Sequence, residues 1–160
     1  MNKWSITGSW IGQYDYDPRP AIPNLAPISF TLQATQGWFG FFRGVVQEES
    51  TKGAPEPATV RGQVFGSQLV LRKWYPKFYV TDGTRWITLK TSIERDHRIV
   101  VDDEIAALPI MYWGEYNSQS ETIIGSWQFE ETYVSFKSEG KRLYLPFGKN
   151  TGKWFMHREV

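Results

Sequence analysis

The sequence predicts an all-β protein: a single antiparallel up-and-down β-barrel of about 8–10 strands that spans residues 1–160 as one domain. Three observations lead to this prediction. The chain holds 8 Trp, 8 Tyr and 10 Phe, residue types that favour strands. Apolar and polar residues alternate with a period of two along most of the chain. Glycine recurs at one fixed place in that alternation.

The N-terminal segment 4–16 reads as one long strand, because every even position carries an aromatic residue, Ile or Gly while the odd positions are mostly polar. The next segment, 18–27, has four prolines in ten residues. Proline cannot donate to a strand ladder, so this segment is predicted to be a loop.

The remaining strands follow as hairpins and short segments separated by turns. The predicted strands are 28–35, 37–49, 58–65 and 67–75 (a hairpin through Gly66), 77–80 and 85–90 (around Asp82-Gly83), 109–117, 121–130, and the C-terminal stretches YVSFK, RLYLPF and KWFMHRE. The only helix candidate is 101–107, within the poorly patterned segment 92–108. No linker divides the chain.

Glycine falls on the apolar face of five segments. These are Ile6-x-Gly8-x-Trp10, Phe42-x-Gly44-x-Val46, Val60-x-Gly62-x-Val64, Tyr112-x-Gly114-x-Tyr116 and Ile123-x-Gly125-x-Trp127. A glycine within a strand costs about 0.5–1 kcal/mol relative to alanine. In a narrow barrel this cost has a reason, because the missing side chain lets the strand coil and leaves room for a large neighbouring ring. A β-sandwich with incidental glycines is the alternative.

The Gly8-Ser9-Trp10 stretch on a long first strand, followed by a β meander, resembles the calycin superfamily, which includes lipocalins, fatty-acid-binding proteins and avidins. In lipocalins the tryptophan of this motif packs across the closed end of the barrel under an arginine from near the C-terminus. The resemblance therefore implies a structural clamp of Gly8, Trp10 and Arg158, with Arg142 as the fallback. It implies no specificity for biotin, lipid or haem.

Composition excludes several classes of function. Lys and Arg number 18 and Asp and Glu 17, so there is no basic excess for nucleic acid and no electrostatic case for a membrane surface. The absence of cysteine excludes disulfides and thiolate chemistry. Without a signal-like N-terminus or an apolar run of ~18 residues, we expect a cytoplasmic protein.

No motif identifies a catalytic residue, a metal site or a cofactor. His97 and His157 lack ligand spacing, and strand parity turns His157 away from the interior if Trp154 faces it. The acidic run 102–104 lacks the glycine and spaced ligands of a calcium loop. The carboxylates nearest a barrel mouth, at Glu48-Glu49, Asp15 and Asp17, could form an acid–base pair but are expected to be solubilising surface charge.

The segment RKWYPKFY (72–79) interleaves basic and aromatic residues, a pattern that can stack single-stranded nucleic acid. However, Arg72 and Trp74 share one strand face while Leu71, Lys73 and Tyr75 share the other. Together with the near-neutral charge, this splitting disfavours a nucleic-acid surface.

The favoured function is the binding of a small apolar or aromatic ligand inside the barrel, because aromatic residues dominate the faces predicted to point inward. The predicted ligand-binding residues are Tyr14, Phe30, Arg43, Lys73, Trp86, Tyr112 and Trp127. Two alternatives stay open: a packed barrel that acts as a structural or interaction domain, with homo-oligomerisation through strand edges, and an enzyme of unknown reaction on the same fold.

Overall fold

The computed structural model describes residues 4–18, 26–77, 79–81, 86–88, 99–100, 109–130, 132–138, 141–147 and 149–160. Its strands are β1 (Gly8–Tyr14), β2 (Ile28–Gln36), β3 (Phe41–Glu48), β4 (Ala58–Phe65), β5 (Gln68–Trp74), β6 (Tyr79–Thr81), β7 (Trp86–Thr88), β8 (Ile99–Val100), β9 (Ile110–Asn117), β10 (Thr122–Phe129), β11 (Thr132–Ser138), β12 (Lys141–Phe147) and β13 (Asn150–Arg158). A single 3₁₀ turn, η1 (Trp38–Gly40), interrupts this all-β pattern within the described residues.

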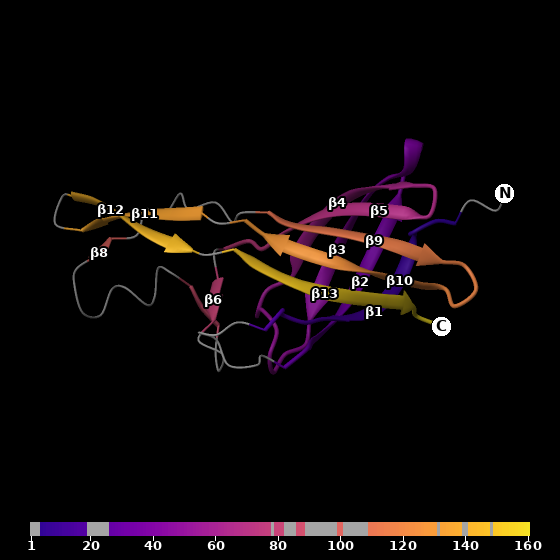
Figure 1. Cartoon of the computed structure of the whole chain (residues 1–160), viewed down its shortest axis with the longest axis horizontal. Helices are drawn as coiled ribbons and strands as arrows, with labels where there is room; N and C mark the ends of the chain where they lie inside the picture. Colours follow the sequence, from indigo (N-terminus) through magenta and orange to yellow (C-terminus); the bar gives the residue numbers. More distant parts are fainter. Residues whose placement is uncertain are drawn as a thin grey trace.

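Eight strands form a closed antiparallel barrel in the order β1-β13-β10-β9-β5-β4-β3-β2 (Figure 1). Strands that follow one another along the chain are neighbours, and β1 closes the barrel by pairing with β13. At this seam Trp10 lies opposite Arg158 and Tyr14 opposite Trp154. The predicted up-and-down barrel is thus confirmed, and the β-sandwich alternative is wrong.

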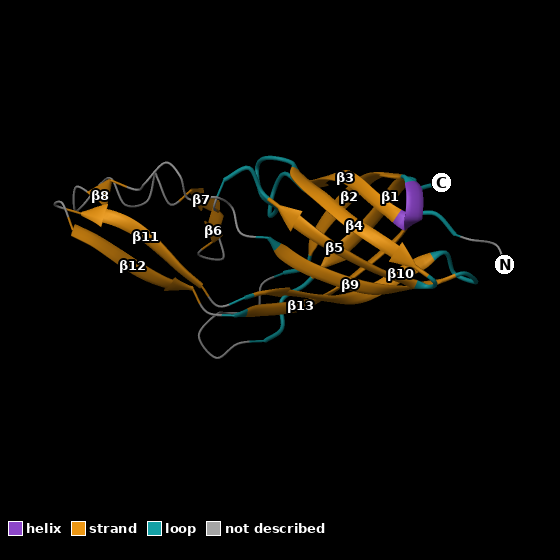
Figure 2. Cartoon of the chain, turned by 90° about the horizontal axis from the view of Figure 1, so that it is seen from above, coloured by secondary structure: helices purple, strands orange, loops and turns teal. Residues whose placement is uncertain are grey.

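The barrel has two distinct ends. At the Tyr14 end, β1 stops and β2 begins, with Tyr14 opposite Ile28. At the Trp10 end, β2 turns through η1 into β3, and the C-terminus after β13 lies nearby (Figure 2).

Five of the strands that the structure describes do not belong to the barrel. β6 pairs with β7, and β11 pairs with both β12 and β8 in a separate three-stranded sheet. Both views draw β11 and β12 beyond the Tyr14 end (Figures 1 and 2). The alternation of apolar and polar residues cannot distinguish these strands from those of the barrel. It indicates that a segment is a strand with one apolar face, but not which sheet the strand joins.

The inward faces of the strands form one apolar core. Its most completely buried large side chains are Trp10, Ile6, Leu32, Leu69, Ile123 and Met156. They come from β1, β2, β5, β10 and β13 and from the segment before β1. Burial of such side chains on folding is the main stabilising contribution to a barrel of this size.

Inward glycines make room for aromatic rings, as the sequence pattern predicts. A methyl group at Gly62 would lie 2.6 Å from Cζ of Phe42, and one at Gly114 would lie 2.7 Å from Cζ2 of Trp154. Both distances are far below van der Waals contact. The large ring on one strand therefore depends on the missing side chain on another strand.

One predicted strand is shorter in the structure, and several predicted elements lie outside the described residues. The strand predicted over 37–49 begins only at Phe41, because residues 38–40 form η1 and Phe39 adopts a left-handed φ of 55°. Most of the proline-rich loop, the Asp82-Gly83 turn and the helix candidate 101–107 lie outside the described residues. Among the described residues, no helix is long and apolar enough to cross a bilayer.

Candidate functional site

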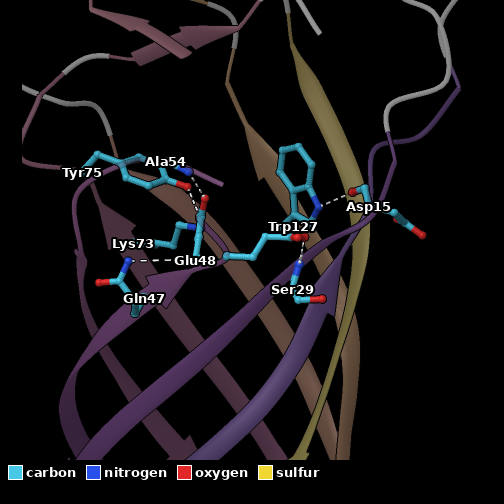
Figure 3. Close-up of polar contacts among 9 residues, drawn as sticks. Asp15, Ser29, Gln47, Glu48, Ala54, Lys73, Tyr75 and Trp127 are labelled. Carbon is cyan, nitrogen blue, oxygen red and sulfur yellow. Dashed lines mark hydrogen bonds and ion pairs between the residues drawn. The ribbon is translucent and has the colours of Figure 1, made fainter. Parts of the chain in front are cut away.

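The Tyr14 end of the barrel contains a buried ion pair (Figure 3). Glu48 and Lys73 are only 4% and 3% exposed, and the Lys73 Nζ donates to Glu48 Oε1 across 2.7 Å. They reach each other from β3 and β5, across the intervening β4, on which Val60 lies opposite Lys73 and Ala58 lies opposite Val46. Removing two charges from water is costly unless both are well paired and hydrogen-bonded.

The Glu48 carboxylate has partners on both oxygens. The Tyr75 hydroxyl donates to Oε1, and the Ala54 backbone N–H donates to Oε2 at 2.6 Å. Ala54 belongs to the connection between β3 and β4 and is itself 1% exposed. This connection therefore folds over the carboxylate and holds it in place.

The Lys73 ammonium lies among aromatic rings. Its Nζ is 4.6 Å from the ring centroid of Tyr14, 4.8 Å from that of Tyr75 and 5.5 Å from that of Tyr112. Cation–π contacts of this kind stabilise a buried ammonium, by up to about 2 kcal/mol each when water is excluded.

The pKa values of the pair are shifted in opposite directions. Burial alone would raise the pKa of Glu48, but the charge of Lys73 and the hydrogen bonds from Lys73, Tyr75 and Ala54 lower it. Burial alone would lower the pKa of Lys73, but its electrostatic interactions with Tyr75 and Glu48 raise it. Both groups therefore stay charged across the neutral range.

Tyrosines surround the pair and are neutral at physiological pH; Tyr14 and Tyr112 are buried, and Tyr16 and Tyr75 are half-buried. Burial raises the pKa of Tyr16 to about 12 and raises the pKa of Tyr14, Tyr75 and Tyr112 well above the ordinary value. The site therefore presents phenol hydroxyl groups, which can both donate and accept hydrogen bonds.

One of these hydroxyls is unpaired. The Tyr14 hydroxyl is buried and makes no hydrogen bond of normal geometry within the described residues. A side-chain hydrogen bond with Tyr14 is the smallest of the effects on the pKa of Tyr16, so any contact between these two hydroxyls is a weak one. A buried polar group without a partner costs about 1–3 kcal/mol, so this hydroxyl needs an explanation.

Aromatic rings build the wall around the Tyr14 hydroxyl. The Trp127 ring makes edge contacts with Tyr14 and Tyr16 at centroid distances of 6.1 and 5.1 Å. Its Nε1 donates to the backbone carbonyl of Asp15 at 2.7 Å, which fixes the indole (Figure 3). Gly152 makes this position possible, because a methyl group there would lie 2.6 Å from Cε2 of Trp127.

A small cavity lies inside the barrel next to the ion pair. Its volume is about 20 Å³ and its wall is almost wholly apolar, with Tyr14, Phe30, Lys73, Tyr112 and Trp154 among the lining residues. A cavity of this size holds about one water molecule. Among the described side chains, this cavity therefore leaves little free space next to the ion pair.

The predicted ligand-binding residues divide into two groups. Tyr14, Phe30, Lys73 and Tyr112 line the cavity, and Trp127 packs against Tyr112 at a centroid distance of 6.3 Å.

The other two predicted residues do not join them. The Arg43 side chain is exposed on the outer face of β3, because it alternates with the inward residues Phe42 and Gly44, so it does not line this cavity. Trp86 begins β7, outside the barrel, and its side chain lies outside the described residues.

At the opposite, Trp10 end, Gly8, Trp10 and Arg158 lie together. The Arg158 guanidinium is 4.6 Å from the ring centroid of Trp10, which is fully buried. Arg158 also donates to the carbonyls of Thr7 and Ser5 at 2.9 and 2.8 Å. A side chain at Gly8, where φ is +125°, would lie 3.1 Å from the guanidinium.

The expectation that the mouth carboxylates are surface charge is wrong for Glu48. A signal was present in the sequence, because Phe42, Gly44, Val46 and Glu48 share one parity and therefore one face. Lys73 is likewise in phase with Leu69 and Leu71. The pairing of the two residues required the strand order, which alternation does not contain.

The other polar candidates have structural positions. Asp15 accepts a hydrogen bond from the backbone N–H of Lys153, and Asp17 from the Thr151 hydroxyl. His157 is exposed, and Trp154 and Met156 face inward. In the part of the chain that the structure describes, no three histidine or carboxylate side chains gather as a metal site needs.

Comparison with protein-family models, with curated proteins and with solved structures found no match to this chain.

Proposed function

We propose that this protein is a calycin-like, cytoplasmic binding protein that takes a small apolar or aromatic ligand at the Tyr14 end of its barrel. The ligand carries a hydrogen-bond acceptor that reaches the Tyr14 hydroxyl beside the Lys73 cation. Because the cavity of about 20 Å³ is small, the body of the ligand lies between the rings of the mouth and only its polar end enters the barrel.

The unpaired Tyr14 hydroxyl is the observation that carries this proposal. It is buried among apolar and aromatic side chains and lacks a partner within the described residues. A site that keeps such a group reduces its own stability, and a ligand that satisfies it regains that free energy on binding. The surrounding Tyr16, Tyr112 and Trp127 supply the apolar contact area that small-molecule sites require.

The pKa values favour binding over general acid–base catalysis. A catalytic acid or base works best with a pKa near the working pH. Here the pKa of Glu48 is lowered and that of Lys73 is raised, while burial raises the pKa of Tyr16 to about 12 and the pKa of Tyr14 well above its ordinary value. None of these groups has a pKa shifted toward neutral pH, where a catalytic acid or base would exchange a proton.

A packed barrel without a ligand is the second candidate, and the small cavity is the observation that favours it. In that case the role of the protein would lie on its outer surface. The two candidates differ in what they require of Tyr14, which is a ligand contact in the first and only a core residue in the second.

The substitution Tyr14→Phe separates the two candidates. It removes the unpaired hydroxyl and leaves the ring, so the free energy of unfolding should rise by about 1 kcal/mol. If Tyr14 contacts the ligand, the same substitution should weaken binding by about tenfold. We would measure unfolding in urea, and binding by tryptophan fluorescence with fatty acids, retinoids, haem, biotin and small aromatic acids.

Tyr116→Phe is the matched control, because this tyrosine lies at the Trp10 end, stacked on Trp4 at a centroid distance of 4.3 Å. It should leave binding unchanged. If no compound changes the fluorescence, or if Tyr14→Phe binds every ligand as tightly as the wild-type protein, the binding proposal fails and the packed barrel stands.

A further inference from the structure

The Trp10 end carries a cluster of exposed aromatic side chains on two neighbouring hairpin turns, which we name the aromatic tip. Trp38 and Phe39 in η1 are each 87% exposed, Phe41 at the start of β3 is 58% exposed, and Phe65 at the end of β4 is 46% exposed. Figure 2 shows η1 at this end of the barrel. Large apolar groups gathered in this way indicate an interaction surface.

The two turns of the aromatic tip are fixed to each other. Gly40, at φ +78°, lies so close to the Val64 carbonyl that any side chain there would collide with it. The Gln63 side-chain amide donates to the Phe39 carbonyl at 3.2 Å. Phe39 itself is held at φ 55°, a conformation that non-glycine residues rarely adopt. The backbone of the two turns thus holds the aromatic side chains of the tip in exposed positions.

Three arginines stand in one row directly behind the aromatic tip. Arg43 pairs with Arg61 across β3 and β4, and Arg61 pairs with Arg72 across β4 and β5. All three side chains are exposed on the outer face of the barrel. Neither of the ion pairs formed within the described residues involves them. Like charges directly opposite each other destabilise a sheet, so this row indicates an anionic partner.

In the sequence, these arginines flank two segments that contain no charged residue. Residues 26–42 and 62–71 contain no charged side chain. Arg43, Arg61 and Arg72 are the first charges that the chain reaches next to the two turns. β9 is the strand next to β5, and it carries the carboxylate of Glu115. This residue lies opposite Gln68, on the side of the aromatic tip away from β3 and β4. The outer face of β3 and β4 is therefore aromatic at its end, and its charged side chains behind that end are the arginines Arg43 and Arg61.

We propose that the aromatic tip docks on the surface of an anionic lipid bilayer. Trp38, Phe39, Phe41 and Phe65 enter the interface between headgroups and acyl chains, a region that aromatic side chains favour. The arginine row then lies at the level of the lipid phosphates, to which guanidinium groups bind well. The near-neutral net charge argues against a membrane surface only when it is averaged over the chain, because register concentrates the positive charge on one face.

Charge complementarity favours the bilayer over the other occupants of such a surface. In a symmetric dimer through the aromatic tip, the arginine rows of two copies would be brought toward each other and repel. Single-stranded nucleic acid would pair with the arginines, but it would leave Trp38 and Phe39, at the end of the hairpin, without a required role. A bilayer satisfies the rings and the row together.

Flotation with vesicles tests this proposal with the full chain. We expect binding to phosphatidylcholine vesicles that contain phosphatidylserine, little binding to phosphatidylcholine alone, and weakening at high salt. The double variant Trp38→Ser/Phe39→Ser should lose at least about tenfold in affinity. The triple variant Arg43→Gln/Arg61→Gln/Arg72→Gln should lose about a hundredfold, because each cation near an anionic membrane contributes roughly a fivefold factor.

Ile124→Ser is the matched control, because this exposed residue (64%) lies on the outer face of β10, and it should bind vesicles like the wild-type protein. All substituted residues are exposed, so circular dichroism should show an unchanged fold. The proposal is overturned if wild-type protein does not float with anionic vesicles or if the tip variants float equally well. It is also overturned if the tip variants only dissolve a dimer seen by light scattering, or if the arginine variants only lose affinity for a single-stranded oligonucleotide.

Discussion

At the scale of single residues, the buried pair of Glu48 and Lys73 makes the strongest demand on the fold. Lys73→Met would leave the Glu48 carboxylate buried without its cation, so the free energy of unfolding should fall by about 3–5 kcal/mol. Urea denaturation measures this loss. Adding Glu48→Gln removes the stranded charge and should recover part of it.

The exposed pair of Lys77 and Glu56 provides the matched control. Its Nζ and Oε1 lie 2.9 Å apart, close to the 2.7 Å of the buried pair, but its side chains are 58% and 39% exposed. Lys77→Met should therefore cost less than about 1 kcal/mol. Equal losses in Lys73→Met and Lys77→Met would show that burial does not determine the strength of the Glu48–Lys73 pair.

The pH dependence of stability follows from the same pair. Because the pKa of Glu48 is lowered in the folded state, its stabilisation is present above the unfolded value of about 4.3 and is lost as pH falls through the folded pKa. In Lys73→Met, burial without the cation should instead raise this pKa, so that protonation at lower pH relieves the stranded charge.

The difference in unfolding free energy between wild type and Lys73→Met should therefore shrink as pH falls from about 7 to about 4. Urea titrations of both proteins across this range measure it. A constant difference would mean that Glu48 is not charged in the folded barrel.

At the scale of strands, inward glycines and large rings form matched pairs. Gly62→Ala should cost roughly 1–3 kcal/mol through overpacking, because the new methyl group would collide with the Val70 carbonyl oxygen and lie 2.6 Å from the Phe42 ring. Gly37→Ala is the control: its nearest neighbour would be the Phe41 carbonyl at 3.8 Å, so it should be close to neutral. Thermal unfolding of both variants tests the pairing, which is refuted if the two melt alike.

The strands themselves could be predicted closely from the sequence, because alternation, turn glycines and proline act over a few residues. The barrel could be predicted because its curvature needs the inward glycines. The inward direction of Tyr14, Phe30, Lys73 and Tyr112 follows from parity alone. By the same reasoning Arg43, which lies between Phe42 and Gly44, belongs outside, and Glu48, which is in phase with Val46, belongs inside.

The parts that could not be predicted depend on neighbours distant in sequence. The Glu48–Lys73 pair needs β3, β4 and β5 in that order, and the row of Arg43, Arg61 and Arg72 needs their register. The unpaired Tyr14 hydroxyl is a property of the packed core. Which strands pair outside the barrel also depends on neighbours distant in sequence. These strands are β6, β7, β8, β11 and β12.

At the scale of the whole molecule, closure of the barrel determines which residues meet at its two ends. The seam between β1 and β13 places Arg158 over Trp10 at one end and Tyr14 opposite Trp154 at the other. Arg158→Lys keeps the charge but loses the planar group that reaches the carbonyls of Thr7 and Ser5. We expect a loss of about 1–2 kcal/mol in unfolding free energy, measured in urea against His157→Gln, which changes an exposed neighbour.

Backbone NMR of the uniformly labelled protein tests the closed barrel most directly. The register predicts interstrand nuclear Overhauser effects that join β1 to β13, linking Trp10 with Arg158, Gly12 with Met156 and Tyr14 with Trp154. Amide protons along this seam should also be protected from exchange. If β1 and β13 show no such cross-peaks and exchange as free edges, the sheet is open and the enclosed site around Tyr14, Glu48 and Lys73 does not exist.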